Sequence, residues 1–430
     1  MPKTALIINP YIHDFKLYDE WMHPIGLYLL KALLQESGYE TLFFNCLERD
    51  SKKTGKYNTA KFRFKEIKKP TLYKNINRKF KRYGVSGSSF FYFLSQQNEP
   101  DLIFIGSMMT YWLSGVSETI QIVRKVFPHS KIIVGGIGAR LFSSHLELKH
   151  PDCMILKDIG ELYSSIHLKK GIEINKLSLI SGFSCLKNAF HAPILTTLGC
   201  PFSCSYCASS LLQPNFWKRS SNLVIHEIDF MSKQFGVVDF AFFDDALLVK
   251  GSDTLCAINR YCKTISSQFR FHTPNGLHIK YIDQEKSDLM FSMGFKTIRL
   301  GYETGSTKYR NHTDSKASKQ SITDRITVLK SSGFRKQNIG VYIMGGLEGQ
   351  NAEELISELN FVASLGVKVK PVFLSPVPGT RIFEHYAKSF PQIRINPLWH
   401  NDTFFITQLP GWSNDIIDNI KKTANKLNQS

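Results

Sequence analysis

Apolar and polar positions follow one repeating pattern in the first 165 or so residues. Short apolar runs alternate there with amphipathic stretches, and glycines follow several of the runs. Strand–helix alternation with glycines at strand ends is typical of a doubly wound parallel sheet. The predicted strands are Thr4–Ile8, Glu40–Cys46, Leu102–Gly106 and Lys131–Val134, and the predicted helices are Ile25–Ser37 and Ser117–Val126.

A second repeating pattern occupies residues 186–385. Six strand–helix units predict a partial (β/α)6 barrel of the TIM type, with its chemistry at the carboxyl ends of the strands. Residues 386–430 form a C-terminal extension with a short helix after Ser413. The predicted strands are Ile194–Leu198, Val238–Phe243, Phe269–His272, Thr297–Gly301, Ile339–Met344 and Lys368–Leu374; the predicted helices are Val224–Phe235, Thr254–Ile265, Gln284–Met293, Ser321–Ser332 and Ala352–Leu365.

Composition favours a globular protein without a membrane span. The chain is 43% hydrophobic and 21% charged, which is enough apolar residue for two cores. The most apolar stretch, Leu102–Val116, is shorter than the roughly 20 residues that cross a bilayer. The opening MPKTALIINP is typical of a first strand rather than of a signal peptide. We therefore expect a cytoplasmic protein.

The net charge of +18 is concentrated in one basic insertion, at about residues 50–90 of the first domain. Thirteen Lys or Arg side chains lie between Lys52 and Arg82 against one acid, Glu66. The interleaved aromatic side chains could stack on nucleic-acid bases, or they could anchor the insertion to the core while lysines reach water. The second interpretation is favoured. These aromatics are Tyr57, Phe62, Phe64, Tyr73 and Phe80.

Three of the eight cysteines fall within eight residues, in TTLGCPFSCSYCASS. Cys200, Cys204 and Cys207 follow the first barrel strand, where one loop can bring three thiolates around one centre. Three cysteine ligands leave one iron of a [4Fe–4S] cluster open, which suits the binding of a substrate. A zinc knuckle is the alternative, but no His or Cys follows Cys207 within a dozen residues to complete it.

The cysteine spacing, with Tyr206 before the third cysteine, resembles the radical S-adenosylmethionine (SAM) superfamily. The resemblance implies that the open iron chelates the amino and carboxylate groups of SAM. Reductive cleavage of SAM would then give a 5′-deoxyadenosyl radical. It also implies an electron donor such as a flavodoxin or a ferredoxin.

Two further motifs place polar residues at strand ends in the order that this family shows. FAFFDDALL sets Asp244 and Asp245 where the family recognises the ammonium of SAM, and a carboxylate is the group that an ammonium requires. A helix N-cap is the alternative for one of the two. FHTPNGLH places Asn275 at the ribose side, against a plain Asn-Gly turn.

The next two strands continue the resemblance. IRLGYETGS is similar to the family's Gly-x-Glu-Ser-Gly and assigns Glu303 to SAM or its ribose. GVYIMGGLEG is similar to the segment that packs on adenine, with Ile343 and Gly345 as the contacts.

The first domain resembles the cobalamin-binding-like domain of one subfamily, in HPIGLYLLKALLQESGYE, IGSMMTYW, IIVGGIGA and DIGELY. A cobalamin tail would pass Ser107, Thr110, Gly135 and Gly136, because small residues let a ligand approach the backbone. The Asp-x-His-x-x-Gly of domains that ligate cobalt is incomplete, since only the His and Gly of HPIG match. Cobalamin therefore stays open at this point.

The leading hypothesis is a radical SAM enzyme, with cobalamin-dependent methyl or alkyl transfer to an unactivated carbon as its reaction. Radical modification of RNA is the first alternative. The methylthiolating enzymes of tRNA need three further cysteines in the first domain, which offers only Cys46 and Cys153. A non-catalytic nucleic-acid-binding iron–sulfur protein is the second, and it leaves the ordered barrel motifs unexplained. No residue pattern specifies the substrate, whether small molecule or peptide.

Overall fold

The computed structural model describes residues 3–266, 268–309 and 318–429, which form two compact units. The N-terminal unit comprises Met1–Asn188 and Ala387–Asn401, and the barrel unit comprises Ala189–Tyr386 and Asp402–Ser430. Residues 386–430, expected as one extension, are divided between the two units. None of the described helices is both long and apolar enough to cross a membrane.

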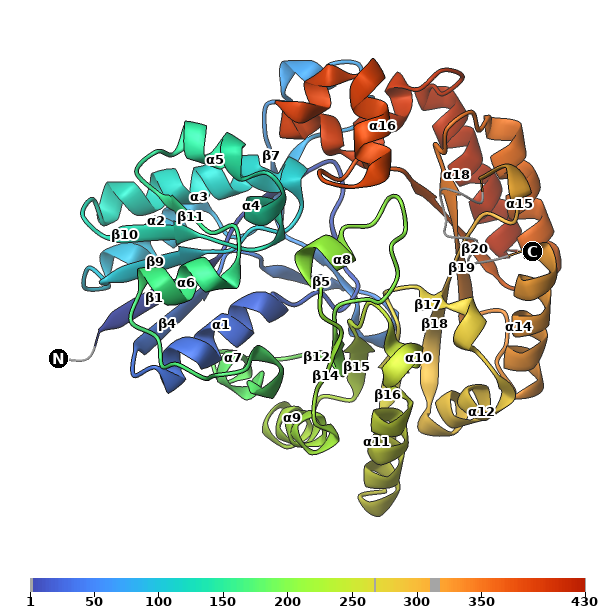
Figure 1. The fold of residues 1–430 in the computed structure, drawn as a ribbon, viewed down its shortest axis with the longest axis horizontal. Coiled ribbons are helices and arrows are strands. Elements are labelled where there is room, and N and C mark those ends of the chain that lie inside the picture. Colours follow the sequence, from blue (N-terminus) through green and yellow to red (C-terminus); the bar gives the residue numbers. More distant parts are fainter. Residues whose placement is uncertain (1–2, 267, 310–317, 430) are drawn as a thin grey trace. The chain divides into compact units, whose positions relative to one another are not determined.

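The N-terminal unit is built on a five-stranded parallel sheet (Figure 1). The strands lie in the order β11-β10-β9-β1-β4. From β1 the chain adds β4 on one side and β9, β10 and β11 on the other, so the order of strand addition changes side between β1 and β9, as in doubly wound folds. Loops that follow these two strands diverge, so the carboxyl edge opens there. The strands are β1 (Thr4–Asn9), β4 (Glu40–Asn45), β9 (Leu102–Ile105), β10 (Lys131–Val134) and β11 (Met154–Ile155).

Helices cover both faces of this sheet (Figure 1). On one face α1 packs on β1, β4 and α7, and on the other α2 and α3 enclose a core with Leu6, Ile103 and Ile132. Helix α3 begins before the predicted Ser117, because the turn at Thr110–Trp112 runs directly into it. The helices are α1 (Ile25–Glu36), α2 (Gly87–Ser95), α3 (Leu113–Val126), α4 (Ile137–Leu141), α5 (Ser143–Lys149), α6 (Ile159–Ser165) and α7 (Ile180–Phe183).

The basic insertion folds into strands that the apolar pattern did not predict. They join two early strands to make two small antiparallel sheets, β2-β8-β7 and β3-β6-β5. Phe62, Tyr73 and Phe80 are buried, as the anchoring interpretation requires, whereas Tyr57 is half-buried and Phe64 is exposed. The strands are β2 (Ile12–Asp14), β3 (Tyr18–Asp19), β5 (Arg49–Thr54), β6 (Ala60–Phe62), β7 (Phe64–Glu66) and β8 (Lys81–Tyr83).

The barrel unit contains six parallel strands in sequence order, β12-β15-β16-β18-β19-β20, with short β17 beside β18. This path does not close on itself, so the fold is a partial barrel. A separate antiparallel pair, β13 (Thr197–Leu198) and β14 (Trp217–Lys218), flanks the cysteine loop. The other strands are β12 (Ala192–Ile194), β15 (Asp239–Phe242), β16 (Arg270–His272), β17 (Leu277–His278), β18 (Phe295–Glu303), β19 (Ile339–Gly345) and β20 (Lys368–Phe373).

Local signals set the limits of the barrel helices. Asp283 and Asn351 accept backbone N–H bonds at the starts of α12 and α15, and Gly236 and Gly294 end α9 and α12 in the left-handed conformation. The helices are α8 (Ser209–Leu212), α9 (Ser221–Phe235), α10 (Leu247–Lys250), α11 (Ser252–Thr264), α12 (Gln284–Met293), α14 (Lys319–Ser331), α15 (Ala352–Ser364), α16 (Arg381–Ser389), α17 (Asp402–Phe405) and α18 (Asn414–Gln429).

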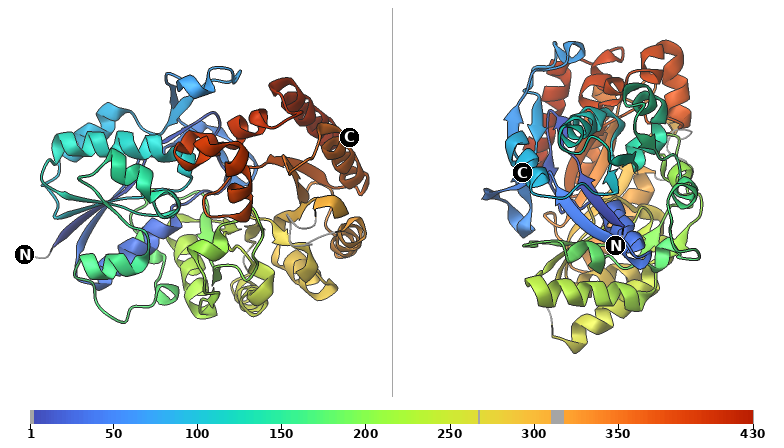
Figure 2. Two further views of the ribbon diagram at one scale, coloured as in Figure 1. Left: turned by 45° about the horizontal axis from the view of Figure 1, so that its top comes forward. Right: turned by 90° about the vertical axis from the view of Figure 1, so that its left-hand side faces the viewer.

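The last helix protects the edge of the barrel sheet (Figure 2). Helix α18 packs on α15 and β20 through Ile417, Ile420 and Ala424. The Asn428 side chain accepts a bond from the Val369 N–H (2.8 Å) and donates to the Val369 carbonyl (2.9 Å). These bonds satisfy backbone groups on edge strand β20 that no further strand pairs.

A buried ion pair supports the strand that leads to the cysteine loop. Arg219 is fully buried and Glu227 is 3% exposed, and Arg219 also donates to the Leu195 carbonyl at 2.8 Å. Glu227→Ala should lower the free energy of unfolding by about 3–5 kcal/mol, because it leaves a buried guanidinium without its carboxylate. Urea unfolding followed by circular dichroism measures this. Asp253→Ala, which breaks the exposed pair with Lys218, is the control and should leave the midpoint in place. Equal midpoints for both variants would contradict the assignment.

Candidate active site

The three cysteines lie on one loop between β13 and α8. Gly199, which precedes Cys200, has φ +86°, and a Cβ there would lie 2.6 Å from the Asn215 carbonyl oxygen, so only glycine fits. Cys204 is buried, whereas Cys200 and Cys207 are half-buried. The loop is therefore fixed at its start and presents two of its thiols at a partly open surface.

The chemistry of the loop is compatible with a cluster in which each cysteine binds a different metal atom. The Ser209 N–H donates to the Cys207 sulfur at 3.5 Å, a bond of the kind that tunes iron–sulfur centres. Burial, together with the neighbouring Asp245 and the other two cysteines, raises the pKa of the Cys200 thiol to about 11, so a bound cation is needed to hold it as a thiolate at neutral pH. Within the described ranges, no three His, Cys, Asp or Glu side chains converge on a single ion. A [4Fe–4S] cluster does not need such convergence, since each cysteine binds a different iron.

Asp244 is buried beneath the start of this loop, and its carboxylate is hydrogen-bonded to other residues of the protein. Its Oδ1 accepts bonds from the Thr196 N–H (3.0 Å) and hydroxyl (2.6 Å) and from the Thr197 N–H (2.5 Å) and hydroxyl (2.6 Å). Burial raises the pKa of Asp244, and these bonds oppose the increase. The carboxylate thus fixes the two residues between β12 and β13. Thr196 and Thr197 were not singled out from the sequence, although TT directly before LGC was visible there.

Asp245 is placed differently from its neighbour. Its side chain is exposed. The carboxylate accepts a hydrogen bond from the Ser209 hydroxyl and is close enough to Cys200 to raise the pKa of that thiol. Of the predicted pair, Asp245 is the carboxylate that faces the cysteine loop.

Tyr206 and Glu303 are brought together from the cysteine loop and the end of β18. The Tyr206 hydroxyl donates a hydrogen bond to the Glu303 carboxylate. Burial of the tyrosine, together with the negative charge of that carboxylate, raises the pKa of Tyr206. Glu303 is 8% exposed and has φ +58°, next to a register shift between β18 and β19. A left-handed conformation at a non-glycine residue is costly and is frequent at functional sites.

Asn275, Ile343 and Gly345 are held within the protein framework. The Asn275 Nδ2 donates to the carbonyls of Phe243 (3.0 Å) and Asp244 (3.4 Å), which ties the segment after β16 to the end of β15. Ile343 is fully buried. A Cβ on Gly345 would lie 2.8 Å from Leu355 Cδ2 and 3.0 Å from Phe373 Cδ1, so close packing excludes any larger side chain.

Tyr342, on the opposite side of β19 from Ile343, was missed in the sequence. Its hydroxyl donates to the Pro274 carbonyl at 2.8 Å, and the side chain is partly exposed. Alternation along a strand predicts that Tyr342 and Ile343 point to opposite faces. That alternation is the signal that could have identified it.

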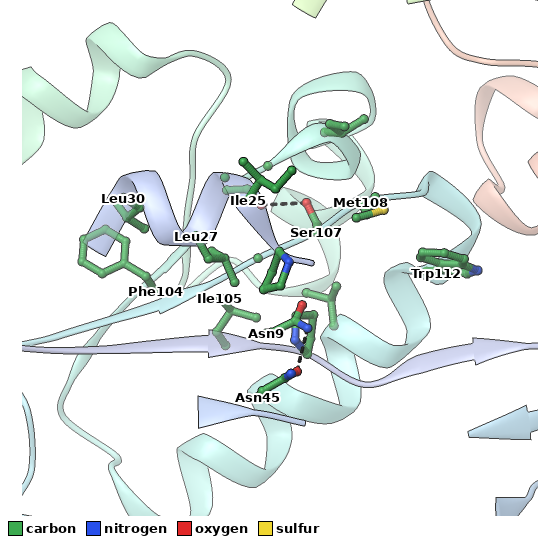
Figure 3. A pocket seen from close by; sticks show the side chains of 18 of the residues that line it. Asn9, Ile25, Leu27, Leu30, Asn45, Phe104, Ile105, Ser107, Met108 and Trp112 are labelled. Carbon is green, nitrogen blue, oxygen red and sulfur yellow. Dashed lines mark hydrogen bonds between the residues drawn. The ribbon is translucent and has the colours of Figure 1, made fainter. Parts of the chain in front are cut away.

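The N-terminal unit contains a cavity of about 280 Å³ at the carboxyl edge of its sheet, where the strand order reverses (Figure 3). Ser107, Gly135 and Gly136 line it, as does His23, whose Nδ1 lies 3.2 Å from the Tyr28 hydroxyl. Ligands of doubly wound folds bind at this position. Three of the four predicted cobalamin contacts therefore share one cavity.

Close backbone packing shapes this cavity. Gly136 has φ +99°, and a Cβ there would lie 2.3 Å from the Ser107 carbonyl oxygen. The Ser107 hydroxyl donates to the Gly135 carbonyl and accepts from the Ala139 N–H, both at 2.8 Å. A side chain on Gly135 would meet only Leu156, at 3.4 Å, so this glycine has more room than Gly136.

Thr110, the fourth predicted contact, is not part of the cavity lining. It is buried, and its hydroxyl lies 2.8 Å from His400 Nδ1. The other ring nitrogen, Nε2, lies 2.7 Å from the Ile393 carbonyl and must carry the proton, so Thr110 donates to Nδ1. Burial lowers the pKa of His400 to about 4, which keeps this ring neutral. Thr110 thus secures the segment that contains His400 to the N-terminal unit.

Known proteins are similar to this chain in sequence and in fold. An uncharacterized methyltransferase of Pyrococcus horikoshii is 23% identical over 194 residues, which cover 45% of this chain and 41% of that protein, so the match spans less than half of the relative. TsrM from Kitasatospora setae, a radical SAM methyltransferase solved with tryptophan and a SAM analogue, has a TM-score of 0.65 and 14% identity over 90% of this chain and 76% of that one.

A second solved structure shares the fold over nearly the whole chain. OxsB, a cobalamin-dependent SAM radical enzyme solved with aqua-cobalamin and SAM, has a TM-score of 0.56 and 12% identity over 92% of this chain and 56% of that one. The sequence profile of the Radical SAM superfamily matches residues 194–362, which include the cysteine loop and the strands from β14 to β19. The barrel unit of this chain therefore contains a radical SAM domain.

Proposed function

We propose that this protein is a cobalamin-dependent radical SAM enzyme that transfers a methyl or alkyl group to an unactivated carbon. One observation carries the proposal. The chain that contains the three-cysteine loop also contains a cavity at the reversal point of a doubly wound sheet, lined by Gly135 and Gly136. TsrM has also been solved with cobalamin and a [4Fe–4S] cluster, so the likeness to TsrM and OxsB supports the same combination of cofactors.

In this proposal, Cys200, Cys204 and Cys207 hold three irons of a [4Fe–4S] cluster and leave the fourth for SAM. When bound, the cluster supplies the electron that cleaves SAM to methionine and a 5′-deoxyadenosyl radical. Asp245 accepts the ammonium of SAM, because it is an exposed carboxylate beside Cys200. The Ser209 hydroxyl donates to Asp245 and orients its carboxylate, and the backbone N–H of Ser209 donates to the Cys207 sulfur.

Glu303 and Tyr206 form the proposed ribose side of the SAM site. Their hydrogen bond holds both side chains next to the cysteine loop, and the left-handed conformation of Glu303 sets the direction of its carboxylate. Asp244 and Asn275 act as positioning residues, because their polar atoms are bonded to the framework around that loop. Ile343 and Gly345 shape β19 from within the packed protein.

The cavity of the N-terminal unit is the proposed site for the nucleotide tail of cobalamin. Its volume of about 280 Å³ is near the lower limit for ligand pockets and suits a part of the cofactor. His23 has the Tyr28 hydroxyl beside Nδ1, where ligating histidines commonly have a carboxylate or a carbonyl. We therefore propose that cobalamin binds without a histidine below the cobalt.

The proposal includes an external electron donor such as a flavodoxin or a ferredoxin, and a small-molecule or peptide substrate. The basic insertion does not favour an RNA substrate, because Phe62, Tyr73 and Phe80 are buried rather than available for stacking on bases.

The two aspartates should respond differently to substitution. Asp245→Asn should weaken SAM binding by about 1.5–3 kcal/mol, the value of a charge-assisted hydrogen bond, while iron content and melting temperature stay at the wild-type level. Asp244→Asn should lower the melting temperature and the iron content, because a neutral amide accepts the bonds from Thr196 and Thr197 more weakly than a carboxylate does. Its NH2 group would also replace the oxygen that accepts a further bond from the Thr196 N–H at 3.2 Å. Isothermal titration with SAM, iron analysis and calorimetry measure these effects. Wild-type SAM affinity in Asp245→Asn would contradict the assignment.

Two substitutions in the N-terminal unit test the cobalamin site. Gly135→Leu should abolish uptake of hydroxocobalamin, because the new side chain fills the cavity where room is available. His23→Ala should keep uptake and leave the cobalt absorption spectrum unchanged. Reconstitution followed by gel filtration and absorption spectroscopy measures both. A large spectral change in His23→Ala would identify a cobalt ligand, and no uptake by the wild type would remove the cobalamin part of the proposal.

A further inference from the structure

The cavity in the N-terminal unit has a mostly apolar lining (Figure 3). The polar side chains that line it are Asn9, Tyr11, His23, Asn45, Ser107 and Trp112. Among the described residues that line it, none is Asp, Glu, Lys or Arg. Its apolar walls come from α1, from β9 and from the segments that follow β10 and β11. The side chains that form these walls include Leu27, Leu30, Phe104, Ile105, Leu156 and Leu162.

The polar side chains of the lining already have partners within the protein. The Ser107 hydroxyl has both a donor and an acceptor, and Trp112 Nε1 donates to Asp14 at 2.8 Å. Asn9 Nδ2 donates to Asn45 Oδ1 at 2.7 Å. Figure 3 shows these two amides side by side, and Asn45 is exposed. The half-buried His23 has its Nδ1 3.2 Å from the Tyr28 hydroxyl. The polar side chains are thus few and partnered, and the remaining walls are apolar.

Such walls discriminate between flat heterocycles of similar size. A benzimidazole with methyl groups has little polar surface to desolvate and gains from burial against Leu, Ile and Phe. An adenine ring carries an exocyclic amine and several ring nitrogens, and each loses its water bonds if no protein group replaces them. The chemistry of the lining therefore favours the alkylated benzimidazole.

We propose that this cavity selects the lower base of a corrinoid cofactor, accepting a dimethylbenzimidazole and disfavouring a purine. The inference rests on the proposed function, because it takes the nucleotide tail of cobalamin as the occupant. It adds a specificity-determining role for the apolar wall, with Leu30 as its testable member: this side chain projects from α1 into the cavity and is only half-buried.

Equilibrium dialysis of the full-length protein against three corrinoids tests the proposal. The probes are hydroxocobalamin, its counterpart with adenine as the lower base, and aquacobinamide, which lacks the nucleotide. Hydroxocobalamin should bind about 10- to 100-fold more tightly than the adenine form, the range over which an apolar pocket rejects added polar groups. Aquacobinamide should also bind more weakly than hydroxocobalamin, because it leaves the cavity unfilled.

A matched pair of variants assigns the effect to the wall. Leu30→Gln supplies a hydrogen-bonding group at a position where glutamine suits the helix, and it should bring the two affinities closer together. Leu30→Met keeps the wall apolar at similar volume and should preserve the wild-type ratio. Melting temperatures close to the wild type show that both variants are folded.

The outcomes separate this inference from the proposed function. Equal affinity for hydroxocobalamin and its adenine counterpart would overturn the selectivity and leave the cobalamin proposal intact. Aquacobinamide binding as tightly as hydroxocobalamin would overturn it too, since the tail would then lie outside the cavity. If the wild type binds none of the three, both the cobalamin proposal and this inference fail. A wild-type ratio in Leu30→Gln would remove the wall from the explanation.

Discussion

The carboxylate of Asp244 is the interaction on which the candidate site depends. One of its oxygens accepts four hydrogen bonds, from the backbone and the hydroxyl of both Thr196 and Thr197. These two threonines connect β12 to β13 and lead into the cysteine loop. Because the carboxylate comes from the end of β15, it joins the first two barrel strands where the loop begins. A buried carboxylate that accepts so many hydrogen bonds restricts the geometry of the segment that it contacts.

In the proposed site, some residues hold the framework in place and a neighbouring one binds the ligand. Asn275 continues the framework by holding the carbonyls of Phe243 and Asp244. Asp245, one position further along the chain, faces the cysteine loop and remains exposed. Tyr206 and Glu303 restrain one another beside the same loop. In the proposed site, stabilising bonds thus surround an exposed carboxylate, and such a rigid surrounding would hold it in place for a ligand.

The sequence predicted most of the fold because apolar periodicity and capping residues agree in both units. Helix α12 lies at the predicted Gln284–Met293, between an Asp cap and a left-handed glycine. The small sheets around β5–β8 were not predicted, because their short strands depend on long-range pairing and carry many lysines. The sequence predicted one strand where the structure has β12 and β13. The strand is interrupted because Thr196 and Thr197 donate hydrogen bonds to Asp244.

Candidate site residues were predicted by type but could not be assigned to roles from the sequence. The paired aspartates are adjacent in the chain, yet only tertiary contacts distinguish Asp244, with its threonine partners, from Asp245. Ser107, Gly135 and Gly136 do share a cavity, whereas Thr110 bonds to His400, nearly three hundred residues later in the chain. Such a distant partner leaves no trace in local periodicity.

Electron paramagnetic resonance of the reduced protein, with and without SAM, is the most direct test of an open iron held by this loop. Anaerobically reconstituted wild-type protein should give a reduced [4Fe–4S] signal whose g-values change when SAM is added, because SAM binds the fourth iron. A cluster signal that SAM leaves unchanged would contradict the account, as would protein that assembles no cluster while its three cysteines are intact.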